Sequence, residues 1–390
     1  MASGLRAKLN AIGAAAPRAE KKPERQCGLL CYAHRVRADE RLFHLDVDGL
    51  RRIGWTGAKF DIRRCIFIDT ETTGLSGGAG TVAFLVGAGY IDGEDFVVEQ
   101  FLMRDYSDEM ELINRLSRRM EGFDCVCSFN GKNFDMPLLC MRFTMCRMRE
   151  KWRDLDQLDL LYPSRRTWKL RLGSCRLGRL EEFILGQPRH GDIPGSEVPQ
   201  RYFDFLKTGD MALLDDIIAH NRQDIVTLGS LLAHLCELYA HPEQETHRAD
   251  LFSMGKALER QGELKPAREL YRIAAIPAPA GSISMLSGGE IAAQAAWRMY
   301  LLARKNRDCE GMRQILEQMA VRRQCREKIY VELSKLYEHH FKNLQRALRY
   351  AELAARYVDK KELDALKRRR ERLRAKLEKE RGRKNHYGLF

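Results

Sequence analysis

Short apolar runs separated by polar turns mark the first half of the chain. They occur at 65–68, 81–91 (TVAFLVGAGYI), 95–103 (DFVVEQFLM) and 124–129 (DCVCSF). Their lengths are typical of buried strands, and the Asp92-Gly93 turn signal joins the second to the third, so the first three predict an antiparallel meander. We expect helices over roughly 107–121, with Ser107 as N-cap, from near Phe134, and over 210–238. Strands followed by strand–helix alternation predict a mixed sheet flanked by helices.

The second half has a helical pattern with an internal repeat. Residues 251–274, 296–319 and 331–354 share a two-helix rhythm, with small residues Ala267, Gly311 and Ala347 at matching places. Spacings near 40 residues with small residues at helix crossings resemble tetratricopeptide repeats. We therefore divide the chain into a flexible basic arm (1–25), an N-terminal extension (26–60), an α/β domain (61–240), an all-α repeat domain (250–358) and a basic tail (359–390).

The net charge of +13 is concentrated at the two ends of the chain. Residues 1–25 hold six basic and two acidic side chains, and residues 359–390 hold thirteen basic and six acidic ones. Such ends suit a nucleic-acid footprint carried on flexible segments. The alternative is a pair of solvated tails that only aid solubility, and charge alone does not decide between the two.

Composition excludes several other classes of protein. With 44% hydrophobic residues the chain can bury a sizeable core. No run of some 18 apolar residues predicts a membrane-spanning helix, and the N-terminus lacks the apolar core of a secretory signal. Eleven cysteines without a repeating frame fit reduced thiols, so we expect a cytoplasmic protein with no membrane partner.

Four acidic residues and one histidine form the candidate chemistry. Asp69 and Glu71 stand two apart at the end of the first strand, so both point to one face. Asp135 follows the fourth strand, and His220 and Asp224 share one face of a helix because they are four residues apart. Converging carboxylates repel unless cations neutralise them, and their oxygens suit Mg²⁺ or Mn²⁺. The alternatives are a capped turn for 69 and 71, a helix N-terminal acid for 135, an exposed helical acid for 224 and a packed histidine for 220.

Three motifs in order, DTETTG, N-x₃-F-D and H-x₃-D, resemble those of the DEDD superfamily of ribonuclease H-like nucleases. The runs SGGAGTVAFLVG, SFNGKNFDMPLL, PSRRTWKLRLGSCRLGRLE and HNRQD are similar to the YprB-like family of ribonuclease H-like domains, which commonly carry tetratricopeptide-like repeats C-terminally. The resemblance implies that Asp69, Glu71, Asp135 and Asp224 bind two divalent ions and that His220 is the general base. It implies hydrolysis of phosphodiester bonds from a 3′ end. The catalytic subclass stays open, because His220 has the spacing to Asp224 that the tyrosine subclass uses.

A basic segment at 163–179 is the candidate nucleic-acid contact. Arg165, Arg166 and Arg176 surround Trp168, which suits a phosphate-tracking groove with a stacking aromatic. The alternative is a solvated loop with Trp168 buried as packing. Gly74 and Leu75 follow the first motif, where related nucleases place backbone against the terminal nucleotide.

The reading that these patterns favour is a ribonuclease H-like α/β domain followed by an α-helical repeat domain, acting as a metal-dependent 3′–5′ exonuclease on single-stranded DNA or RNA ends. The repeats offer a surface for a protein partner. A non-catalytic nucleic-acid-binding adaptor is one alternative, although the intact set of acids argues against it. A structure-specific endonuclease is the other, and the products would distinguish it.

Overall fold

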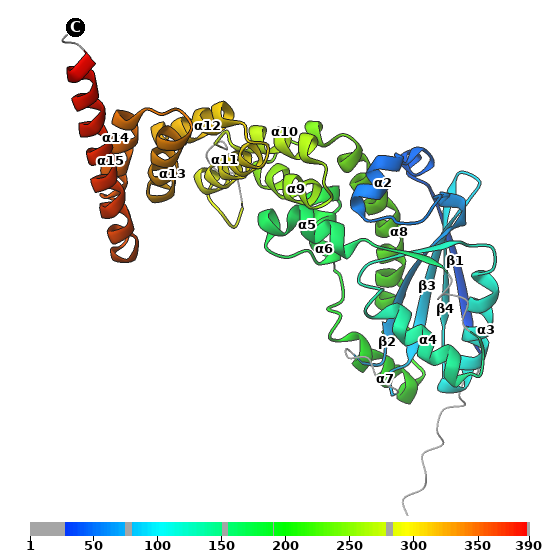
Figure 1. Cartoon of the computed structure of the whole chain (residues 1–390). Coiled ribbons are helices and arrows are strands. Elements are labelled where there is room, and N and C mark those ends of the chain that lie inside the picture. The colour runs from blue at the N-terminus through cyan, green and yellow to red at the C-terminus, as the bar shows by residue number, and fades with distance from the viewer. Residues whose placement is uncertain (1–27, 75–79, 150–154, 190, 278–283, 388–390) are drawn as a thin grey trace, which may run out of the picture. The chain divides into compact units, whose positions relative to one another are not determined.

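A computed structural model describes residues 28–74, 80–149, 155–189, 191–277 and 284–387 (Figure 1). The chain forms two compact units. The sheet unit contains the chain up to Leu45, Gly54–Tyr162 and Arg176–Leu235. The helical unit contains Asp46–Ile53, Pro163–Cys175 and the chain from Cys236 onward. The predicted basic arm 1–25 lies outside the described residues.

The sheet unit is built on six strands in the order β1-β4-β3-β2-β5-β6. Their bounds are β1 Leu30–Arg37, β2 Cys65–Thr72, β3 Ala83–Asp92, β4 Asp95–Leu102, β5 Cys125–Ser128 and β6 Asp156–Asp159. β2, β3 and β4 form the predicted antiparallel meander, β1 adds to β4 in antiparallel fashion, and β5 and β6 continue from β2 in parallel. This confirms the mixed sheet. The edge strands β1 and β6 were not predicted, because each is short or lies in a segment of mixed polarity.

Helices flank this sheet (Figure 1). They are α3 Glu109–Arg119, α4 Asp135–Met145, α7 Val198–Thr208 and α8 Ala212–Ala240, with short helical turns at Glu40–His44, Leu177–Leu180 and Glu181–Leu185. Apolar side chains of α3, α4, α7 and the start of α8 share one core with β2 and β3, among them Ile66, Ile68, Leu116, Phe143, Tyr202 and Ile217. This packing fixes the sheet, and with it the positions of the side chains on its strands.

The predicted helix over 107–121 begins later than expected. A 3₁₀ turn at Tyr106–Asp108 precedes α3, and Asp105 and Asp108 form its capping box. Ser107 is therefore not the N-cap, because Asp105 already supplies the accepting side chain.

The helical unit consists of three helix pairs and a long final helix. The pairs are α9 Arg248–Arg260 with α10 Leu264–Ala274, α11 Gly288–Lys305 with α12 Cys309–Val321, and α13 Arg326–His339 with α14 Leu344–Ala354. α2 Val47–Ile53 also belongs to this unit, as do residues 163–172 of α5 Leu161–Leu172. Ala267 and Ala347 are fully buried, as small residues at helix crossings should be. The all-helical second half is confirmed, and its assignment as a tetratricopeptide-like repeat stays a prediction.

The predicted basic tail is a helix, α15 Lys360–Tyr387, over most of its length. Glu338 on α13, whose side chain is fully buried, accepts hydrogen bonds from Arg369 (2.8 Å), Arg372 (2.9 Å) and Lys376 (2.9 Å). Burial alone would raise the pKa of Glu338, but these cations hold it down at about 2. The expectation of a flexible end is therefore wrong for this segment, because one buried carboxylate fixes three of its basic side chains.

Candidate active site

Asp69 and Glu71 lie inside β2, which continues to Thr72 rather than ending before the acids. In the antiparallel register with β3, Asp69 is opposite Gly87 and Glu71 is opposite Leu85. Side chains alternate along a strand, so these two acids share the face that also carries Phe67. The sequence reasoning therefore placed them correctly on one face at the end of this strand, which extends four residues past the apolar run 65–68.

Helix α8 covers this face closely because β3 has glycines there. A β-carbon on Gly87 would lie 2.4 Å from Oδ1 of Asn221, and one on Gly89 would lie 2.5 Å from Cγ2 of Ile225. The missing side chains let Asn221 reach the strand, where its Nδ2 donates to Oδ2 of Asp69 at 2.8 Å. Gln100 on β4 in turn donates to Oδ1 of Asn221 at 2.8 Å. Asp69 is thus held by two buried side-chain amides, those of Asn221 and Gln100, that are hydrogen-bonded in series.

Asp135 is the first residue of α4 and follows a turn in which Asn130 has a positive φ. Thr70 alternates to the opposite face of β2 from Asp69, and its hydroxyl donates to Oδ1 of Asp135 at 2.5 Å. Asp159 on β6 is buried and accepts from the backbone N–H of Asn130 at 2.8 Å. It therefore shapes the loop that leads to Asp135.

His220 and Asp224 share one face of α8, as their spacing predicts. Nε2 of His220 lies 3.8 Å from Oε1 of Glu71 and 3.7 Å from Oδ2 of Asp224. The other ring nitrogen, Nδ1, lies 2.6 Å from Oδ1 of Asp192. Nδ1 also lies 3.1 Å from Nη1 of Arg189. The shorter contact, with the carboxylate, favours the proton on Nδ1, which leaves Nε2 as the nitrogen that faces the acids.

The electrostatics show that the acids converge. Burial, followed by the charges of Asp224, Asp135 and Glu71, raises the pKa of Asp69 well above its usual range. Burial raises the pKa of Glu71 to about 8, with Asp224 and Asp135 adding to it and His220 opposing it. Burial also raises the pKa of Asp135 to about 6, although the Thr70 hydroxyl lowers it. A cluster of carboxyl groups that resist ionisation together is one that a cation would stabilise.

Burial raises the pKa of Asp224 as well, although His220 and Arg189 lower it. For His220, burial alone would lower the pKa, yet Asp224, Asp192 and Glu71 together raise it. The four predicted acids and the histidine are therefore one electrostatic unit.

The donor set fits a hard divalent cation. Mg²⁺ and Mn²⁺ prefer carboxylate oxygens, and the four acids supply only such donors. Among the described ranges, no three His, Cys, Asp or Glu side chains are already arranged to hold an ion. Binding would thus require some of these carboxylates to turn toward a common point, and the attraction of a divalent cation would offset the repulsion between them.

Some of the predicted nucleic-acid contacts are buried in the structure and others are exposed. Trp168 is 1% exposed within α5, so its ring offers no face to a base, and the packing alternative is the one observed. The first part of this segment is helical and not a solvated loop, because α5 runs to Leu172 and buries Thr167 and Trp168 on one side. Arg166 donates to the backbone oxygen of Ile53 at 2.7 Å. Arg165 and Arg176 are exposed.

Gly74, which ends the first motif, is the last described residue before 75–79. The carbonyl oxygen of Gly74 accepts from the Thr72 hydroxyl at 2.7 Å, which folds the chain back after β2. Leu75, the other predicted contact there, lies outside the described residues. Whether backbone at this place meets a nucleotide stays a prediction.

Sequence reasoning missed the polar residues that support the acids. Asn221 stands next to the predicted base, and Gly87-Ala-Gly89 inside a strand pattern signals close approach of another element, so both carried a readable signal. Glu181, Arg189 and Asp192 come from a turn and a loop with no periodic pattern. Only the tertiary structure brings them to α8.

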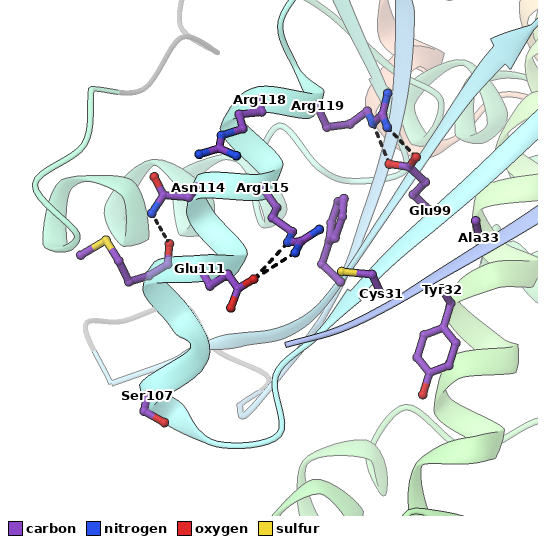
Figure 2. A pocket seen from close by; sticks show the side chains of 12 residues that line it. Cys31, Tyr32, Ala33, Glu99, Ser107, Glu111, Asn114, Arg115, Arg118 and Arg119 are labelled. Carbon is purple, nitrogen blue, oxygen red and sulfur yellow. Dashed lines mark hydrogen bonds and ion pairs between the residues drawn. The ribbon is translucent and has the colours of Figure 1, made fainter. Parts of the chain in front are cut away.

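A separate hollow of about 850 Å³ lies between β1, β4 and α3 (Figure 2). Its basic residues are largely engaged: Arg119 donates to Glu99 at 2.5 Å and Arg115 donates to Glu111 at 3.1 Å. It contains none of the predicted site residues, so it contributes nothing to the chemistry described above.

The mixed sheet and the acids on β2, α4 and α8 are features of a ribonuclease H-like nuclease domain. Consistent with this, the family model described as the ribonuclease H superfamily matches residues 66–236. The chain is also 30% identical over 318 residues to the uncharacterized protein YprB of Bacillus subtilis strain 168, covering 80% of this chain and 74% of YprB. This chain belongs to the YprB family of the ribonuclease H superfamily.

One solved structure was also found to be similar, the family B DNA polymerase of the hyperthermophilic archaeon Pyrobaculum calidifontis. The identity is 15% and the TM-score is 0.34, over 63% of this chain and 30% of the polymerase. This chain therefore corresponds to less than a third of that polymerase's length. None of the helices in the described part of the chain is long and apolar enough to cross a membrane.

Proposed function

We propose that this protein is a divalent-metal-dependent nuclease that releases nucleotides from the 3′ ends of single-stranded DNA or RNA. The observation that carries the proposal is the convergence of Asp69, Glu71, Asp135 and Asp224: burial raises the pKa of each, and the charges of the other acids raise those of Asp69 and Glu71 further. His220 faces two of them. Such a constellation suits hydrolysis of an anionic ester better than it suits a structural core.

The four carboxylates are the groups that would hold Mg²⁺ or Mn²⁺, with room in the donor set for two ions. When bound, such ions lower the pKa of a coordinated water and stabilise negative charge on the leaving oxygen. Asn221 and Thr70 hold Asp69 and Asp135 in place. Their role is to keep the acids oriented while the substrate enters.

His220 is the general base in this proposal. Asp192 accepts from Nδ1, so Nε2 is left to take a proton on the side of Glu71 and Asp224. A ring fixed in this way by a carboxylate is orientated before substrate arrives. In this proposal the catalytic subclass, which the sequence leaves open, is the one with a histidine base.

The exposed arginines Arg165 and Arg176 are the remaining predicted phosphate contacts. Gly74 and Leu75 are proposed to lie against the terminal nucleotide. The helix pairs would dock a protein partner. No disulfide joins any two of the ten described cysteines, and we further propose that the protein acts in the cytoplasm.

The test is a time course on single-stranded DNA and RNA labelled at the 3′ or the 5′ end, with Mg²⁺, Mn²⁺ or chelator. Wild type is compared with Asp69→Asn and with the matched control Asp92→Asn, an exposed acid on β3. We expect mononucleotides from the 3′ end, dependent on metal and on Asp69 only.

Other outcomes select the alternatives. Defined internal fragments would replace the exonuclease by an endonuclease. Absence of any cleavage, with wild type and Asp69→Asn binding the strand equally well, would make the protein an adaptor with vestigial acids.

A further inference from the structure

A buried arginine stands directly behind the carboxylates. The side chain of Arg189 is 12% exposed, and that of its partner Glu181 is fully buried. Nη2 of Arg189 donates to Oε1 of Glu181 at 2.7 Å and Nε donates to Oε2, so the guanidinium and the carboxylate form a bidentate pair. Thr227 on α8 also donates to Glu181. The plane of the guanidinium is therefore fixed from the side away from the acids.

The opposite side of the guanidinium faces the candidate site. Nη2 of Arg189 also donates to Oδ1 of Asp224, while Nη1 lies 3.3 Å from Oδ2 of Asp192. One oxygen of Asp224 is thus occupied. The other, Oδ2, is the one that lies 3.7 Å from Nε2 of His220.

Two roles are physically distinct for a cation in this place. It could compete with a metal ion for Asp224 and leave when the ion arrives, or it could stay and hold the carboxylate. Departure would strand Glu181 as a buried, unpaired charge, which is costly. Because Glu181 and Arg189 also cancel each other's charge, the pair adds little net repulsion toward a divalent ion. Both arguments favour the second role.

We propose that Arg189 is a positioning residue of the nuclease site, fixed by Glu181, which holds Asp224 so that its Oδ2 is offered to a divalent ion. The inference rests on the proposed function, because it requires Asp224 to be a metal ligand. Residues that hydrogen-bond to metal-binding carboxylates typically change metal affinity about 10- to 100-fold when replaced.

The test measures Mn²⁺ binding to the full-length protein without nucleic acid, by the electron paramagnetic resonance signal of free Mn²⁺. The variant is Glu181→Gln with Arg189→Gln, which removes the pair and keeps the net charge of the site. The matched control is Glu111→Gln with Arg115→Gln, an exposed pair on α3 (Figure 2). We expect about 10- to 100-fold weaker binding in the first and wild-type binding in the second.

A second variant guards against misfolding of the first. Arg189→Lys keeps the positive charge, but a single ammonium group cannot contact both oxygens of Glu181 and one oxygen of Asp224 at the same time. This variant should therefore also weaken Mn²⁺ binding. Equal or tighter binding in a folded variant, beside a wild type that binds and cleaves, would overturn the positioning role alone. A wild type that neither binds Mn²⁺ nor cleaves would instead overturn the proposed function.

Discussion

Gly87 is the position in β3 where one added methyl group should disturb both the fold and the site. The β-carbon of an alanine there would lie 2.4 Å from Oδ1 of Asn221 and 3.0 Å from Cγ1 of Ile225. Both neighbours are fully buried on α8, so neither can swing away into solvent. The helix must move by roughly 0.6–1 Å to restore ordinary contact distances.

The size of the effect follows from this displacement. Overpacking of this kind costs about 1–3 kcal/mol, which lowers the melting temperature of a unit of some 200 residues by roughly 2–12 °C. His220 and Asp224 lie on the same helix, so a shift near 1 Å should reduce kcat by about 100-fold.

The assay combines thermal unfolding with cleavage of a 3′-labelled strand. The control is Gly289→Ala at the start of α11, where an added β-carbon has no neighbour within 4 Å and should change neither readout. Gly87→Ala should also cost less stability in an Asn221→Ala background, because the nearest obstacle is then gone. A Gly87→Ala protein that melts within about 1 °C of wild type and cleaves at the wild-type rate would refute the close seating of α8 on β3.

Three further changes test other parts of the structure. Thr70→Val keeps the shape but removes the donor to Asp135, so the Mn²⁺ concentration for half-maximal cleavage should rise about 10-fold; an unchanged value would deny Thr70 this role. Glu338→Gln leaves the largely buried Arg369 without its counter-charge, while Arg372 and Lys376 are half exposed, and should destabilise the helical unit by about 3 kcal/mol in circular-dichroism melts, against under about 1 kcal/mol for the exposed Glu352→Gln. The folded pKa of Glu338, about 2, lies below its unfolded value, so its stabilisation is present above about pH 4.3 and should disappear as the pH falls toward 2. The pH dependence due to Asp250 has the opposite direction, because burial raises the pKa of its carboxyl group to about 7 despite the contact with Arg171. The free energy of unfolding should therefore decrease as the pH rises from about 4 to 7. Asp250→Asn should flatten this slope in melts across the same range.

Local patterns sufficed wherever a feature depends on chain geometry alone. The two-residue period of a strand put Asp69 and Glu71 on one face, and the helical period did the same for His220 and Asp224. The meander and the helix pairs followed from periodic apolar positions. These expectations hold because they require no knowledge of what lies opposite each element.

Expectations failed where a residue's role depends on its partners. Trp168 sits in an arginine-rich stretch that reads as exposed, yet α5 turns its ring inward. The tail after residue 359 reads as solvated, yet Glu338 binds three of its cations. Charge composition predicts that such side chains are exposed to solvent on average, but a single buried counter-charge is enough to fix them against the protein.

The sequence by itself determined that a mixed sheet would carry four acids and a histidine, because strand and helix periods are local, and the resemblance of its three motifs implied a ribonuclease H-like domain. Only the tertiary structure decided what supports them. Asn221 reaches Asp69 because β3 has glycines opposite it, and Glu181, Arg189 and Asp192 meet α8 because a turn and a non-periodic loop end beside it. Contacts between segments far apart in the chain depend on packing, and packing is not encoded in any one segment's pattern.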